Sequence, residues 1–192
     1  MRVQRDARFG LFVLIGGWPG SGKSTLARAL AAELRLPLLA KDEIKETLAD
    51  ELGQPSTVAE SQRLGRVAVL VMLRVAQQCP SAVMDSTWFA YTRPLVTKLP
   101  GRLVEIQCLV PRELARSRYY TRADVRHVGH FDRARSEDEL WGNPPQPLGV
   151  GATIEVDTSG AVDLPLLATR VLHAANLSIV EIDPGSTVDT AP

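Results

Sequence analysis

Residues 17–24 read Gly17-Trp18-Pro19-Gly20-Ser21-Gly22-Lys23-Ser24, and this stretch decides the fold of the chain. Residues 11–15 before it are apolar throughout, as a strand buried at the centre of a parallel sheet should be. Residues 24–34 after it have helical periodicity and stop before Pro37. A Gly-x-x-x-x-Gly-Lys-Ser pattern between a strand and a helix predicts a loop that binds phosphate groups.

The residue types in this loop follow from the chemistry of phosphate binding. Glycines let the backbone curl until successive N–H groups point at phosphate oxygens, and the following helix adds the positive end of its dipole. Lys23 would place a charge beside the β- and γ-phosphates, and the Ser24 hydroxyl would be a ligand of Mg²⁺. We predict that the chain binds ATP, or alternatively GTP, together with Mg²⁺ through Gly17, Gly20, Ser21, Gly22, Lys23, Ser24 and Thr25.

Outward from the loop, the chain alternates short apolar runs with helical patterns. The further predicted strands and helices are 38–40, 82–84, 103–110 and 153–156, and 42–51, 58–78, 112–126 and 164–175. Strands that alternate with helices imply a parallel sheet covered on both faces, a doubly wound α/β domain. We predict that the domain spans residues 1–176 and that residues 177–192 are a C-terminal tail.

Composition limits the classes of function that fit the chain. Its 192 residues suffice for one domain with a sizeable core. Lys plus Arg and Asp plus Glu each total 22, so no net charge attracts nucleic acid or an anionic membrane. Cys79 and Cys108 are isolated, which is typical of reduced thiols. No run approaches the roughly 18 apolar residues that a membrane helix needs, and we expect a cytoplasmic protein without membrane contact.

Two common classes of nucleotide-binding protein do not fit the chain. A GTPase would need Asn/Thr-Lys-x-Asp after a late strand, and Thr97-Lys98-Leu99-Pro100 lacks the aspartate. A mechanical ATPase would need a strand ending in Asp-Glu, whereas the predicted third strand ends in Val83-Met84-Asp85-Ser86. The missing glutamate favours transfer of a phosphoryl group to an acceptor over hydrolysis.

Two aspartates follow predicted strands and are candidates for the acceptor side of a site. Asp42 comes after the second strand, where the crevice of an open α/β sheet lies, and a carboxylate there could accept the proton of a hydroxyl. The alternative is that Asp42 caps a helix. Asp85 could orient the water shell of Mg²⁺ or hold the substrate, and its alternative is an Asx-turn that closes the strand.

Three motifs together resemble a known family. They are the phosphate-binding run 14–25, Lys41-Asp42-Glu43-Ile44 and Val83-Met84-Asp85-Ser86-Thr87. They look like those of the small P-loop kinases, which include polynucleotide 5′-kinase, chloramphenicol phosphotransferase, zeta-type toxins and AAA-type ATP-binding kinases. The resemblance covers about residues 11–175, and the phosphate-binding run is its most specific part.

The resemblance implies both a fold and roles for particular residues. It implies a P-loop NTPase with a five-stranded parallel sheet and a mobile, arginine-bearing lid, here about residues 112–150. It implies that Asp42 is the general base and that Thr87 belongs to the site. Asp85 would bind Mg²⁺ through water, beside the direct ligand Ser24. The predicted substrate contacts are Asp42, Lys45, Asp85 and Thr87.

Arginines recur every four residues where the lid is expected. On a helix, Arg118, Arg122 and Arg126 would share one face, and repulsion between them suggests that an anion faces them. Guanidinium groups bind phosphate oxygens bidentately, so we predict Arg122 and Arg126 as catalytic residues and Arg118 as a nucleotide contact. The alternative is a solvated basic face. His127 and His130 are interpreted as loop histidines rather than as a metal pair.

The leading hypothesis is an ATP-dependent kinase that transfers the γ-phosphoryl group to a hydroxyl of a small molecule. Lys23 and Asp42 would carry the chemistry with the two arginines. One alternative acceptor is the 5′-hydroxyl end of a nucleic acid. The other alternative is a non-catalytic switch controlled by nucleotide, and the protein would be a monomer or a homodimer. Acceptor-pocket residues are expected in 53–63 and 128–150.

Overall fold

The computed structural model describes residues 10–123, 126–131 and 134–180. Its centre is a five-stranded, all-parallel sheet in the order β2-β3-β1-β4-β5. The strands are β1 (Gly10–Gly17), β2 (Leu38–Ala40), β3 (Ala82–Asp85), β4 (Gly101–Leu109) and β5 (Ala152–Asp157). The predicted five-stranded parallel α/β fold is therefore confirmed.

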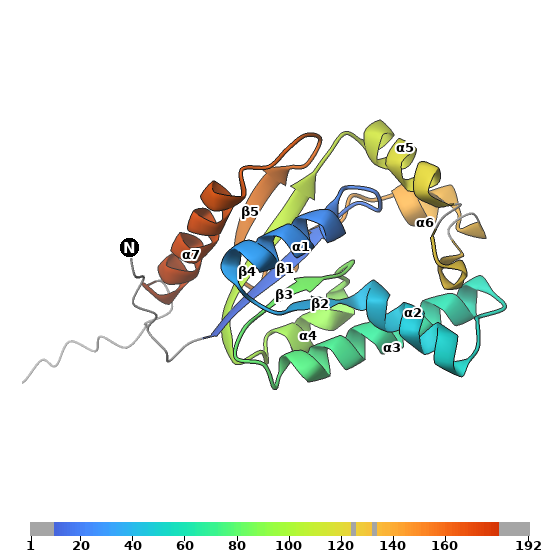
Figure 1. Cartoon of the computed structure of the whole chain (residues 1–192), viewed down its shortest axis with the longest axis horizontal. Coiled ribbons are helices and arrows are strands. Elements are labelled where there is room, and N and C mark those ends of the chain that lie inside the picture. Colours follow the sequence, from blue (N-terminus) through green and yellow to red (C-terminus); the bar gives the residue numbers. More distant parts are fainter. Residues whose placement is uncertain (1–9, 124–125, 132–133, 181–192) are drawn as a thin grey trace, which may run out of the picture.

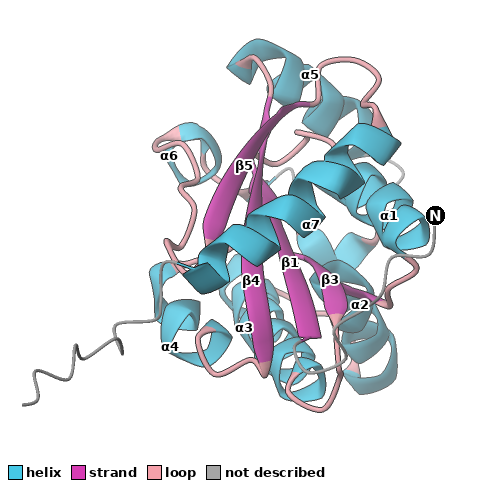
Figure 2. Ribbon diagram, turned by 90° about the vertical axis from the view of Figure 1, so that its left-hand side faces the viewer, coloured by secondary structure: helices cyan, strands magenta, loops and turns pink. Residues whose placement is uncertain are grey.

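Helices cover both faces of the sheet, as Figures 1 and 2 show. One face carries α1 (Lys23–Leu34) and α7 (Leu164–Val180), and the other carries α3 (Val58–Ala76) and α4 (Arg93–Val96). The helix α2 (Lys41–Leu52) packs against α3. This arrangement leaves the carboxyl ends of the strands free to form a site.

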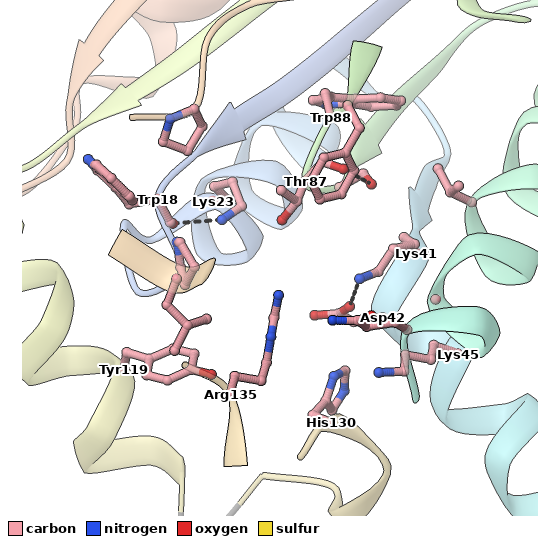
Figure 3. A pocket seen from close by; sticks show the side chains of 18 of the residues that line it. Trp18, Lys23, Lys41, Asp42, Lys45, Thr87, Trp88, Tyr119, His130 and Arg135 are labelled. Carbon is pink, nitrogen blue, oxygen red and sulfur yellow. Dashed lines mark hydrogen bonds and ion pairs between the residues drawn. The ribbon is translucent and has the colours of Figure 1, made fainter. Parts of the chain in front are cut away.

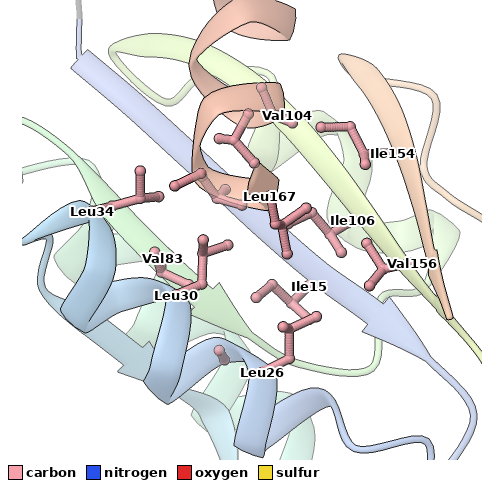
Figure 4. Close-up of a cluster of buried hydrophobic side chains, with 14 of the residues drawn as sticks. Ile15, Leu26, Leu30, Leu34, Val83, Val104, Ile106, Ile154, Val156 and Leu167 are labelled. Carbon is pink, nitrogen blue, oxygen red and sulfur yellow. The ribbon is translucent and has the colours of Figure 1, made fainter. Parts of the chain in front are cut away.

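Alternation along β1 explains why the sheet has two cores. Successive side chains of a strand point to opposite faces. Val13 and Ile15 join α1, α7 and the neighbouring strands in the cluster of Figure 4, whereas Phe12 and Leu14 pack with α3. All four side chains are at most 1% exposed. A strand without any polar residue is therefore required at this position.

A third, smaller core holds the predicted lid together. The segment 112–150, predicted as a lid, contains α5 (Arg112–Ala123), the 3-10 turn η2 (Val128–His130) and α6 (Glu137–Trp141). Trp141 is fully buried between Tyr119 of α5 and Trp18 of the phosphate loop, with ring centroids 5.7 and 5.6 Å away. Packing of aromatic rings thus connects α5 and α6 to the loop that precedes α1.

A buried carboxylate fixes the segment between α6 and β5. Glu105 of β4 is 3% exposed and accepts the backbone N–H groups of Leu148 and Val150 at 2.5 and 2.7 Å. Gln107, two residues along the same strand, donates to the carbonyl of Pro145 at 2.7 Å. Hydrogen bonds to a charged acceptor are among the stronger ones, so this returning segment is held firmly beside the sheet.

The largest differences between the helices and the predictions lie in three places. Residues 90–96, for which no element was predicted, form the 3-10 turn η1 (Ala90–Thr92) and α4. The helix α5 ends at Ala123, and α7 continues to Val180. Residues 177–180 of the predicted tail are thus helical, and residues 181–192 lie outside the described residues. In the described parts of the chain, no helix is long and apolar enough to cross a bilayer.

Candidate active site

A cavity of about 520 Å³ opens where the first three strands end. The register places Asp85, the last residue of β3, between Ile15 of β1 and Ala40 of β2. The loops that leave these strands therefore start side by side, at the edge where open α/β sheets bind ligands. The phosphate loop, α2, α3, α5 and the segment around α6 surround the cavity.

The phosphate loop has a backbone shape that only glycine tolerates easily. Gly20 and Gly22 have positive φ angles of 76° and 85°. A Cβ atom at Gly20 would lie 2.2 Å from the carbonyl oxygen of Ala115 in α5. The loop thus depends on glycine both for its curl and for its close approach to α5.

Lys23 is the first residue of α1, and its side chain lies in the cavity. Its ammonium donates to the carbonyl of Trp18 at 2.7 Å, which Figure 3 marks. Burial lowers the pKa of Lys23, and the charge of Asp85 opposes that shift. A half-buried ammonium at the start of a helix can bind phosphate oxygens strongly.

Ser24 and Asp85 meet in the same cavity. Asp85 is 7% exposed and accepts a hydrogen bond from the Ser24 hydroxyl. Burial raises the pKa of Asp85, whereas Lys23 and this hydrogen bond act in the opposite direction. A hydroxyl and a carboxylate are the oxygen donors that Mg²⁺ prefers alongside water and substrate phosphates. Among the described residues, no cluster of three His, Cys, Asp or Glu side chains could hold a metal by itself.

Asp42 faces the cavity and does not cap a helix. The N-cap of α2 is Ala40, and no side chain caps this end. One oxygen of Asp42 lies 2.5 Å from the Lys41 ammonium, and the other accepts from Arg126 at 2.5 Å. Burial opposes ionisation, but Lys41 and Arg126 outweigh it and hold the pKa of Asp42 far below its usual range. Asp42 is therefore a carboxylate at neutral pH.

The three predicted lid arginines do not lie on one helix face. Arg122, in the last turn of α5, lies over the ring of Tyr119 at 6.0 Å. Arg126 comes after the end of that helix and contacts Asp42. Arg118 donates to the carbonyls of Thr158 and Ser159, at 2.9 and 2.7 Å, in the loop after β5.

The predicted site residues divide into two groups by position. The cavity is lined by Gly20, Gly22, Lys23, Ser24, Asp42, Lys45, Asp85, Thr87, Arg122 and Arg126. Gly17, Ser21, Thr25 and Arg118 are not among its lining residues. Ser21 is fully buried in the phosphate loop, and Thr25 is exposed on α1.

Several lining residues were not predicted individually. Lys41, Arg66 and Arg135 line the cavity. Arg135 belongs to the segment 128–150 in which acceptor contacts were expected. The position of Lys41 beside Asp42 was a usable signal, because residues next to a strand end enter the same crevice. Arg66 on α3 carried no such signal.

Two histidine–carboxylate contacts fasten the turn η2 to α2. His130 lies 2.7 Å from Glu46, and His127 lies 2.9 Å from Asp50. Between them, the carbonyl of Gly129 accepts the hydroxyl of Ser61 on α3. Both histidines are thus loop histidines with protein partners, as predicted, and His130 also lines the cavity.

Replacing His130 with Gln is expected to weaken the pH dependence of stability. Burial and the charge of Arg126 lower the pKa of His130, although Asp42 and Glu46 favour its cation. The unfolded chain then binds more protons than the folded one below about pH 6.5, so acid destabilises the fold. The free energy of unfolding should fall less between about pH 7.5 and 5.5 in His130→Gln than in the wild type. Urea titrations at both values check this, with the exposed His173→Gln as control. An unchanged slope would contradict it.

Comparison with known proteins gives one family and a set of similar folds. The model of a family described as "AAA domain" (AAA_33) matches residues 12–138. The crystal structure of a "putative kinase" from Chloroflexus aurantiacus is 28% identical, with a TM-score of 0.75 over 86% of this chain and 98% of that one.

More distant structures share the fold alone. A gluconokinase from Sinorhizobium meliloti is 18% identical with a TM-score of 0.56, over 91% of this chain and 96% of that one. A shikimate kinase from Acinetobacter baumannii is 18% identical with a TM-score of 0.53, again over 91% of this chain and 96% of that one.

An uncharacterized protein of Mycobacterium tuberculosis is 29% identical over 126 residues, which are 57% of this chain and 25% of that protein. The matching region thus spans only about a quarter of this curated relative.

Proposed function

The chain belongs to the AAA domain family, and from that premise we propose that it is an ATP-dependent kinase acting on a hydroxyl of a small molecule. The observation that carries the proposal is that one cavity contains both the phosphate loop and an ionised carboxylate. Lys23 follows β1 and Asp42 follows β2, on either side of Asp85. A phosphoryl donor and a proton acceptor would meet there.

The loop and the lid would hold the donor. Backbone N–H groups of the phosphate loop and the Lys23 ammonium would bind the β- and γ-phosphates. Ser24 directly, and Asp85 through water, would hold Mg²⁺, which neutralises developing charge on the phosphates. Arg118 would lie beside the base end of the nucleotide, because it is anchored on the loop after β5.

Asp42 would act as the general base. The acceptor oxygen attacks the γ-phosphorus as its proton passes to Asp42, the bond from that phosphorus to the bridging oxygen breaks, and ADP leaves. Arg126 contacts Asp42 and belongs to the lid, so it could move toward the transferred group when donor and acceptor bind. Loss of that ion pair would raise the pKa of Asp42 and make it a better base.

The lid would exclude water from the transfer. We propose that residues 112–150 form this lid within a single domain of residues 1–176. Trp141 of this segment contacts Trp18, which belongs to the phosphate loop itself. Binding of the donor to the phosphate loop would thus also act on the lid. A closed lid would favour the acceptor hydroxyl over water as the group that attacks.

Calorimetry with Mg²⁺ and either ATP or GTP tests the first half of this proposal. We expect heat of binding with ATP. Release of ADP is then measured with a panel of hydroxylated small molecules, and mass spectrometry of the product should show one added phosphoryl group. Transfer only to an oligonucleotide with a 5′-hydroxyl would replace the acceptor class. Binding without any transfer, accompanied by a change in assembly, would favour a switch. No heat with either nucleotide would overturn the proposal.

A further inference from the structure

Lys45, which the sequence predicts as a substrate contact, is a buried cation without a role in the phosphoryl transfer proposed above. It lies on α2, is 6% exposed, and lines the cavity next to Asp42 and His130. Its ammonium donates to the Ser61 hydroxyl at 2.7 Å, and Ser61 donates in turn to Gly129 at 2.6 Å. An ammonium has three N–H donors. Among the described residues its hydrogen-bond partner is thus a neutral hydroxyl.

The carboxylates near Lys45 are already paired with other cations. Asp42 is held by Lys41 and Arg126 at 2.5 Å, and Glu139 is held by Arg135 at 2.7 Å. The lysine and arginine side chains that line the cavity outnumber its carboxylates by seven to three. A buried charge without a close counter-ion is costly. Burial and the charge of Lys41 lower the pKa of Lys45 to about 8, and the charge of Asp42 opposes this shift only in part.

The nucleotide would not supply the missing negative charge. Its triphosphate is placed by the phosphate loop and Lys23, with Arg122 and Arg126 on the lid side. Lys45 lies on the far side of Asp42 from that loop, in contact with α3 and η2. A negative group near Lys45 would therefore have to come from the acceptor.

We infer that the acceptor is an anionic alcohol, whose carboxylate, phosphate or sulfate group binds Lys45 while its hydroxyl faces Asp42. This inference rests on the proposed kinase function. Residues three apart on a helix lie about 5–6 Å from each other. The anionic group and the reacting hydroxyl of the acceptor are thus close to each other within the acceptor molecule. Arg135, which projects into the cavity, is the second cation within reach of the anion.

Inorganic phosphate serves as the probe of this subsite. The protein is saturated with Mg²⁺ and the non-hydrolysable analogue AMPPNP, which fills the nucleotide site, and phosphate is then titrated by calorimetry. We expect Lys45→Met to weaken phosphate binding by at least about tenfold, because one charge-assisted contact is lost. Lys45→Arg should keep most of the affinity. The matched control is Lys98→Met, which alters an exposed lysine that does not line the cavity.

Each outcome of this titration has a definite meaning. Equal phosphate affinity in wild type and Lys45→Met, or no phosphate binding to the wild type with AMPPNP bound, would overturn the inference. Circular dichroism of Lys45→Met separates loss of the fold from loss of the subsite. Failure of the kinase proposal is distinguishable, because acceptor-dependent ADP release would then be absent while phosphate binding still depended on Lys45.

A second readout applies to any acceptor that the enzyme phosphorylates. Each anionic acceptor is compared with its neutral amide or ester. Lys45→Met should lower kcat/KM for the anionic member at least about tenfold, leave the neutral member nearly unchanged, and leave the KM for ATP unchanged. Equal losses for both members would assign Lys45 to a general structural role and overturn the inference.

Discussion

A Lys23→Ala variant is expected to lose most of its affinity for MgATP. Lys23 is the half-buried cation of the phosphate loop, and its ammonium is within reach of any group bound there. Removing one partner of a buried charge pair costs about 2–5 kcal/mol, which corresponds to a rise in Kd of roughly 30-fold to several thousand-fold. Calorimetric titration with MgATP measures this directly.

The fold itself should tolerate this change. Lys23 is a desolvated cation whose pKa is lowered by burial, so its removal eliminates a buried charge as well as the hydrogen bond to Trp18. We expect Lys23→Ala to unfold at nearly the same urea concentration as the wild type. Lys98→Ala is the matched control for the loss of a lysine outside the cavity. An unchanged Kd for MgATP in Lys23→Ala would show that the phosphate loop is not part of the nucleotide site.

Local patterns were enough to predict the sheet and the phosphate loop. The apolar run of β1, the glycines with positive φ and the helix that follows are all determined within about twenty-five residues. Asp42 and Asp85 could be placed because parallel strands end at one edge of the sheet, and their positions needed only the strand ends. These features depend on short-range sequence and on one rule of topology.

Contacts over long sequence separations could not be predicted. Arg126 reaches Asp42 across 84 residues, and Ser61 reaches Gly129 across 68. Both contacts depend on how η2 and the residues just before it pack against α2 and α3, which no periodicity encodes. The expected arginine stripe was wrong for the same reason. It assumed that one helix continues to Arg126, whereas α5 ends at Ala123.

An Asp42→Asn variant is expected to bind MgATP with nearly wild-type affinity and to transfer the phosphoryl group far more slowly. Asparagine has almost the same shape but accepts no proton, and general bases typically contribute 10²–10⁴-fold to the rate. We therefore expect kcat to fall by about two to four orders of magnitude. Acceptor-dependent release of ADP, with MgATP binding measured by calorimetry on the same sample, tests this.

The control must separate loss of the base from loss of a charge on α2. Asp50→Asn removes a carboxylate of the same helix, which contacts His127 and does not line the cavity, so its kcat should remain within about threefold of wild type. Asp42 also anchors Lys41 and Arg126, and a small effect on kcat would assign it that role alone. Arg126→Met tests this alternative, because it leaves the carboxylate in place while it breaks one anchor. If Asp42→Asn and Arg126→Met lowered kcat equally and only slightly, a group other than Asp42 would have to accept the proton of the acceptor hydroxyl.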